Sequence, residues 1–188
     1  MRLLAFAIIL PLLATSCAFT PHEVAVTAKA PATPSDIGKG TTIALETLDD
    51  RETLVVGQRG VGMQGADITA RQVMTALKTQ LETGFRAKGF DVTDQSDGQR
   101  PEVEARLRSF KFFIESGFFT GAENVDTAIA IEARKNGKRF HQIYRSSSEN
   151  RTLVVPGGAT IDQKLNASLT DVLQQIFADN TLMRFLVD

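Results

Sequence analysis

The chain of 188 residues predicts an α+β fold, a two-layer sandwich in which two main helices cover one face of a mostly antiparallel sheet. Two segments, 68–88 and 160–178, repeat apolar residues at helical spacing. The region between them alternates apolar and polar residues and contains an Asn-Gly turn signal. The predicted order is therefore strand, helix, strand, three-strand meander and helix.

The first predicted strand and the first predicted helix flank a glycine-rich segment. Residues 41–48 alternate in polarity and predict a short strand, whereas residues 49–66 predict a flexible loop. At the start of the helix, Thr69 and Gln72 have the spacing of a capping box, with Asp67 as a competing cap. Gly89 is expected to end the helix.

A brief strand at 90–93 precedes the meander, whose last turn is the pair Asn136 and Gly137. This pair is typical of a two-residue type I′ hairpin. Pairing outward from the turn places Ala133 opposite Phe140 and puts apolar residues on one face and mostly polar residues on the other.

The first strand of the meander changes its alternation midway. Leu107 and the apolar residues before it have odd numbers, whereas Phe110 and those after it have even numbers. One face can bury both sets only if the strand contains an extra residue, so we predict a β-bulge near Arg108 and Ser109.

The next turn is predicted at Ser116 and Gly117, which would pair Ile114 with Phe119 on the core face.

The last main helix is expected at 160–178, with Thr160 and Gln163 as a second capping box. A short terminal helix is predicted at 180–186. The apolar stripe of the main helix consists of Leu165, Leu169, Val172, Leu173, Ile176 and Phe177.

The beginning of the chain has the pattern of a lipoprotein signal peptide over residues 1–16. Its apolar run is too short to span a bilayer, and it leads through small residues into Cys17, the single cysteine. This resembles the bacterial lipobox, with Ala14 in place of the usual leucine. The resemblance implies that Cys17 is acylated, with palmitate among its acyl chains, and anchors the chain to a membrane. Ala18, where no Asp stands, implies the outer membrane.

Residues 17–40 are expected to form the acylated cysteine and a flexible tether, because this stretch contains three prolines and few large apolar residues. Residues 41–188 are expected to form a single periplasmic domain. The net charge of −1 and the absence of a basic block argue against nucleic-acid binding.

Several motifs contain residues typical of chemical sites, but none of these motifs predicts a cofactor, a metal or catalysis. Residues 60–65 spell G-x-G-x-x-G, but the clear strand ends well before them and no repeated βα units follow. Residues 49–52 combine carboxylates with an arginine and read as a self-neutralising loop. His22 and His141 stand far apart, and the serines at 146–148 lack the context of a nucleophile.

A partner surface is the stronger hypothesis. In a cluster of five phenylalanines, Phe113 and Phe118 are predicted to point away from the core. The glycine-rich loop is a second candidate surface. Its candidate residues are Gly57, Arg59, Gly60, Gly62 and Gly65.

The order and spacing of several short motifs resemble the YajG-type lipoprotein family over about residues 41–186. The matching residues are Asp50-Arg51, Arg86-Ala87-Lys88-Gly89-Phe90, Lys135-Asn136-Gly137-Lys138, Tyr144-Arg145 and Asp179-Asn180. The resemblance implies a membrane-anchored periplasmic domain with no assigned activity.

We therefore expect a non-enzymatic, outer-membrane-anchored lipoprotein that binds or scaffolds an envelope protein and can form homo-oligomers. One alternative is a carrier of a lipid or other apolar ligand, which requires a cavity between helices and sheet. The other is an enzyme, which requires clustered carboxylates with perturbed pKa values in a cleft.

Overall fold

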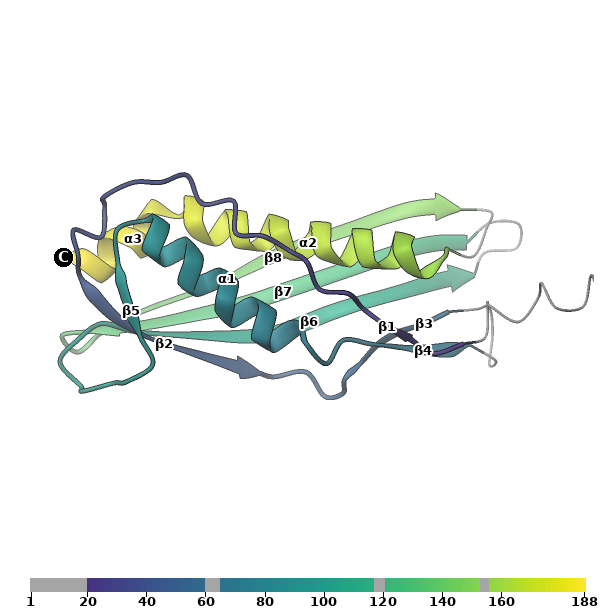
Figure 1. Cartoon of the computed structure of the whole chain (residues 1–188), viewed down its shortest axis with the longest axis horizontal. Helices are drawn as coiled ribbons and strands as arrows, with labels where there is room; N and C mark the ends of the chain where they lie inside the picture. Colours follow the sequence, from purple (N-terminus) through teal and green to yellow (C-terminus); the bar gives the residue numbers. More distant parts are fainter. Residues whose placement is uncertain (1–19, 60–64, 117–120, 153–155) are drawn as a thin grey trace, which may run out of the picture.

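The computed structural model describes residues 20–59, 65–116, 121–152 and 156–188, and it shows helices packed on one face of a long sheet (Figure 1). The elements in chain order are β1 (His22–Glu23), β2 (Thr42–Asp49), β3 (Val55–Arg59), β4 (Ala66–Thr69), α1 (Val73–Ala87), β5 (Asp91–Thr93), β6 (Glu102–Ser116), β7 (Gly121–Lys135), β8 (Lys138–Thr152), α2 (Gly158–Ala178) and α3 (Asn180–Val187).

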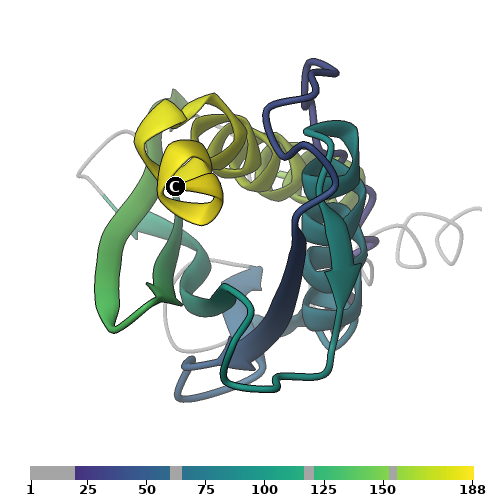
Figure 2. The ribbon, with the colours of Figure 1, turned by 90° about the vertical axis from the view of Figure 1, so that its left-hand side faces the viewer.

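The main sheet has the strand order β5-β2-β6-β7-β8, and the predicted α+β sandwich is confirmed. The long strands β6, β7 and β8 form an antiparallel meander. β2 instead pairs in parallel with both of its neighbours, β5 and β6. Viewed along the long axis, the sheet curves around the helices, which lie on its inner side (Figure 2).

The Asn-Gly hairpin is confirmed together with its register. Ala133 pairs with Phe140, and the pairing continues without a shift to the ends of β7 and β8. Asn136 and Gly137 have φ values of 50° and 74°, the left-handed conformation that a type I′ turn requires.

The predicted bulge is also confirmed, because the pairing of β6 with β7 shifts between Leu107 and Ser109. The prediction for the preceding turn is wrong. Ile114 pairs with Glu123, because β6 continues to Ser116 and the connection to β7 is longer than a tight turn. Phe119 lies outside the described residues.

Both predicted capping boxes are wrong. Thr69 ends β4, and its hydroxyl donates to the Glu23 carboxylate instead of capping a helix. α1 begins later, after Gln72, whose side chain makes no capping hydrogen bond. α2 begins before Thr160, with Gly157 as its N-cap residue.

The core lies between the helices and the meander. Phe85 of α1 makes edge-to-face contacts with Phe90 and with Phe177 of α2, at ring-centroid distances of 5.9 and 5.3 Å. The predicted apolar stripe of α2 is buried throughout. The largest fully buried side chains are those of Phe85, Phe110, Phe112, Ile43, Ile68, Leu77, Leu81, Leu107, Ile129, Ile131, Ile161 and Leu165.

A second, three-stranded sheet was not predicted. Its order is β1-β4-β3, and it takes up much of the segment that was expected to be a glycine-rich loop. Gly57 lies so close to β6 that a Cβ atom there would be 1.9 Å from the carbonyl oxygen of Phe112. This glycine is required for a close backbone approach and does not serve chain mobility.

The expected flexible tether is wrong for its described part. Residues 24–40, which we call the strap, run over α1 and α2 (Figure 1). Val24 and Ala28 are buried in the core. The Asn166 side chain accepts hydrogen bonds from the backbone N–H groups of Thr27 and Ala28 at 2.7 and 2.8 Å. Polar side chains of the helices therefore satisfy several backbone N–H groups of this proline-containing segment.

Candidate functional site

The helices leave one face of the meander uncovered, and we call it the open face. Side chains alternate along each strand, so the residues next to the core positions point to this face. Its members include Glu104, Arg106, Lys111, Phe113, Asn124, Asp126, Glu132, Arg134, Arg139, His141, Ile143, Arg145, Ser147 and Glu149.

A shallow groove of about 640 Å³ surrounds Phe113 on the open face. The Phe113 side chain is 41% exposed, whereas its neighbour Phe112 is fully buried, which confirms that Phe113 points away from the core. The groove is lined by Lys111, Phe113, Asn124, Val125, Asp126, Arg145, Ser147, Ser148 and Glu149. An aromatic ring with polar groups around it is the composition of a protein contact site.

The groove has a fixed charged border. Arg145 donates two hydrogen bonds to the Asp126 carboxylate, at 2.8 and 3.2 Å. A bidentate pair of this kind holds both side chains in one orientation. The polar rim beside Phe113 is therefore ordered, so a contact made there would cost little side-chain entropy.

Charges elsewhere on the open face are largely paired within the chain. Asp50 lies 3.4 Å from Arg106 and 3.1 Å from Arg108. Arg134 donates to Glu132 at 2.8 Å, and this hydrogen bond lowers the pKa of Glu132. A carboxylic acid that serves as a general acid near neutral pH needs a raised pKa, so Glu132 has the opposite character.

The cluster at residues 49–52 connects two segments of the fold. Arg51 donates two hydrogen bonds of 2.8 Å to the Asp49 carboxylate. It also donates to the carbonyl oxygen of Ala70 at 3.4 Å, and only 4% of its side chain is exposed. Arg51 thus joins the end of β2 to the segment that leads into α1.

A partly buried polar contact fixes the C-terminal helix to the sheet. The Tyr144 hydroxyl lies 2.6 Å from the Asp179 carboxylate, which also caps the N-terminus of α3 by accepting from the Thr181 and Leu182 N–H groups. Burial raises the pKa of Tyr144, and the bond to Asp179 raises it further. For Asp179, burial favours the neutral acid, but the hydrogen bonds from Tyr144 and the helix outweigh it and lower its pKa.

The structure describes only some of the other residues that were predicted to form a partner surface. Gly57 and Arg59 belong to β3, and Gly65 directly precedes β4. Gly60 and Gly62 lie outside the described residues, as do Phe118 and Cys17. A strand, β4, follows the G-x-G-x-x-G motif where a dinucleotide site requires a helix. β3 nevertheless packs beside β6, which brings Gly57 close to the strand that carries Phe113.

Sequence reasoning missed the polar side chains that hold the strap. Asn166 and Gln80 appear in the sequence as ordinary polar positions of helices. Their partners, Ala28 and Ala30, are small residues without any pattern that predicts docking.

Comparison with solved structures gives several matches. A Xanthomonas campestris protein of the DUF330 family matches 88% of this chain and 96% of its own, with a TM-score of 0.55 at 12% identity. An uncharacterized protein has a TM-score of 0.49 at 11% identity, covering 89% of this chain and 97% of its own. A Helicobacter pylori homolog of neuraminyllactose-binding hemagglutinin has a TM-score of 0.47 at 9% identity, covering 82% of this chain and 93% of its own. The first of these likenesses shows the fold alone.

The fold thus defines the class of the protein, an α+β domain, and no helix in its described part is long and apolar enough to span a membrane. A family model for an uncharacterized lipoprotein family, Lipoprotein_16, matches residues 28–187. The chain belongs to this family, and the predicted resemblance to the YajG-type lipoproteins is confirmed. A comparison with proteins of curated function gives no match.

Proposed function

We propose that the protein is an outer-membrane lipoprotein, anchored through acylated Cys17, whose periplasmic domain is a non-enzymatic binding or scaffolding module for another envelope protein. The observation that carries the proposal is the groove around Phe113 on the open face. Phe113 exposes an apolar ring beside the ordered Asp126–Arg145 pair. Burying such a ring against a partner contributes about 1.5–3 kcal/mol.

A protein partner is favoured over an apolar ligand by the packing. In the described part of the chain, fully buried side chains of α1 and α2 pack between helices and sheet. The groove around Phe113 and two other hollows, of about 380 and 580 Å³, lie at the surface and are lined largely by charged and polar residues. A carrier for a lipid would instead present an enclosed apolar cavity.

The proposed anchor at Cys17 gives a first testable prediction. Cys17→Ala removes the thiol that is acylated, so the variant is expected to lose palmitate labelling and to leave the outer-membrane fraction. Two or more acyl chains are needed for durable attachment, and no other cysteine can carry them. Labelling and density-gradient fractionation measure this, with Ser16→Ala as the matched control that keeps a small residue before Cys17. Normal labelling of Cys17→Ala would contradict the anchor.

The groove around Phe113 gives a second testable prediction. Phe113→Ser is expected to leave the thermal unfolding temperature nearly unchanged, because the side chain is already half in solvent, while crosslinks to the partner in cells are lost. Ile143→Ser is the matched control, since Ile143 is 51% exposed on the same face but lies outside the groove.

Two results would contradict the assignment of the groove as the partner surface. A large fall in unfolding temperature would show that Phe113 stabilises the fold. Equal loss of crosslinks in both variants would show that contact is not specific to the groove.

A further inference from the structure

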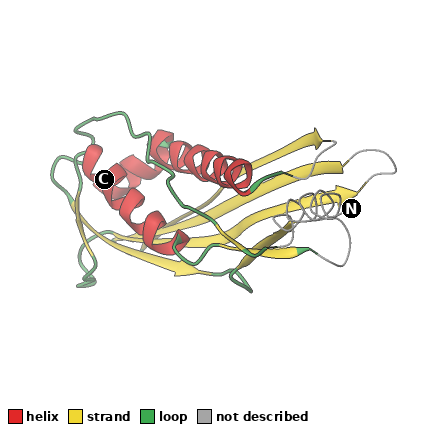
Figure 3. Cartoon of the chain, turned by 45° about the vertical axis from the view of Figure 1, so that its right-hand side comes forward, coloured by secondary structure: helices red, strands yellow, loops and turns green. Residues whose placement is uncertain are grey.

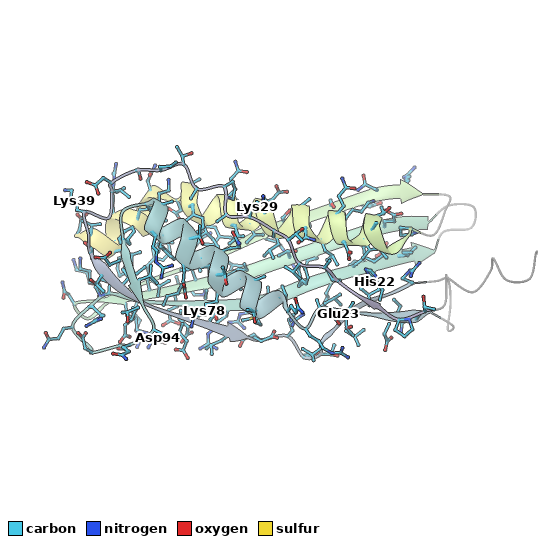
Figure 4. The ribbon with its side chains drawn as sticks, viewed as in Figure 1. His22, Glu23, Lys29, Lys39, Lys78 and Asp94 are labelled. Atoms are coloured by element: carbon cyan, nitrogen blue, oxygen red, sulfur yellow. The ribbon has the colours of Figure 1, made fainter. Side chains whose placement is uncertain are left out.

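The chain enters the domain at a fixed point. His22 Nε2 lies 2.7 Å from the Asp162 carboxylate of α2. His22 and Glu23, labelled in Figure 4, pair with Ile68 and Thr69 of β4, and the Thr69 hydroxyl donates to the Glu23 carboxylate at 2.5 Å. The bond from Thr69 lowers the pKa of Glu23. Side-chain and backbone bonds together hold this entry point against two elements.

The entry point lies at the end of the molecule where the long strands meet their connections. Ser116, Gly121 and Thr152 are paired neighbours at the ends of β6, β7 and β8. Gly158, the first residue of α2, touches His22, since a Cβ atom there would lie 2.7 Å from its ring. Figures 1 and 3 show these ends on the same side of the molecule as the start of the described chain.

We call this end the strand-end face. Its described members are Arg59, Ala66, Glu115, Ala122, Arg151 and Gly158.

The distance from the anchor to this face is short. Cys17 stands five positions before His22 in the sequence. Each residue of a fully extended chain spans at most about 3.6 Å, so the anchor lies within about 18 Å of His22. β6, β7 and β8 each have 15 residues, which corresponds to a length of about 50 Å. The anchor therefore reaches the strand-end face but cannot reach the Asn136 hairpin at the opposite end.

We propose that the strand-end face rests on the bilayer that holds acylated Cys17, with the long axis of the sheet directed away from the membrane. The proposal rests on the lipid anchor proposed above. Because residues 24–40 are held on the helices, they cannot lengthen the attachment.

The sides of the domain are poorer contacts for lipid. The open face carries many charged residues of both signs in ion pairs, including Asp126 with Arg145 and Glu132 with Arg134. Laying this face on a bilayer would dehydrate these charges, which favours the upright orientation.

The orientation can be measured with one matched pair of variants. Arg139 and Arg151 are exposed arginines on the same strand and the same face, roughly 40 Å apart at strand spacing. When Cys17 is acylated, Arg139→Cys or Arg151→Cys supplies the single free thiol for an environment-sensitive fluorophore. The labelled, acylated chain is reconstituted into vesicles of phosphatidylethanolamine and phosphatidylglycerol that contain a lipid-borne, short-range quencher.

We expect the label at position 151 to lose most of its fluorescence and the label at position 139 to keep it. Equal quenching at both positions would show a domain lying flat. No quenching at either position, in protein that floats with the vesicles, would show that the strand-end face stands clear of the bilayer. Both results overturn the orientation while the anchor remains. Failure of the acylated protein to float with the vesicles would overturn the anchor and, with it, the orientation.

Discussion

Phe110→Ala is expected to lower the free energy of unfolding by about 3–5 kcal/mol, because it empties a fully buried site in the middle of the core. Phe110 follows the bulge in β6, and the bulge is what returns its side chain to the helix-covered face. Urea unfolding monitored by circular dichroism measures the change.

Arg108→Ala is the matched control for this variant. Arg108 sits at the bulge, exposed, with one surface ion pair to Asp50 at 3.1 Å. Such pairs contribute about 0–1 kcal/mol, so the control should unfold close to the wild type. Small and equal effects at Arg108 and Phe110 would contradict the burial of Phe110.

Gly57→Ala is expected to destabilise the protein by about 3 kcal/mol, at the upper end of the range for overpacking. Its new methyl group would lie 1.9 Å from the carbonyl oxygen of Phe112. That oxygen belongs to the backbone of β6, and Phe112 is itself fully buried, so neither strand can move aside without disturbing the core. Thermal and urea unfolding measure the loss.

The matched control for Gly57 is Gly157→Ala. A Cβ atom at Gly157 meets nothing within 4 Å, and the φ of −72° suits any residue. As an N-cap substitution it should cost less than about 1 kcal/mol. If Gly57→Ala unfolds like this control, β3 does not pack against β6 as tightly as the structure shows.

Local signals in the sequence predict the meander well. The Asn136-Gly137 turn determines the register of β7 and β8 because its conformation admits only one pairing. The change of alternation between Leu107 and Phe110 predicts the bulge, since a period of two leaves no other way to bury both residues.

The remaining elements depend on contacts between distant parts of the chain. Thr69 has a capping-box spacing with Gln72, yet the Glu23 carboxylate and the burial of Ile68 draw it into a strand. β3 and β4 are short, and no hairpin signal of the Asn-Gly kind joins them. The partner of β1 lies 46 residues away from it in sequence, which no local pattern can predict.

The candidate site likewise combines a feature that local sequence predicts with one that depends on contacts between distant residues. The alternation of β6 predicts that Phe113 points outward, because the neighbouring residue, Phe112, must face the core. The groove beside it depends on Asp126 and Arg145, which are 19 residues apart and meet only when β7 and β8 pair. Sequence therefore predicts the exposed ring but not its ordered polar border.

The way the strap is held also sets an order of events during synthesis. Some of the residues that bind it come from near the end of the chain, since Thr27 and Ala28 are joined to Asn166 across 139 and 138 positions, whereas Ala30 is bound by Gln80 of α1. Until α2 has been made, residues 27 and 28 lack these bonds, although Gln80 of α1 can already bind Ala30. The strap is therefore complete only after α2 has been made, and under the orientation proposed above, close seating of the domain on the bilayer would require the finished polypeptide.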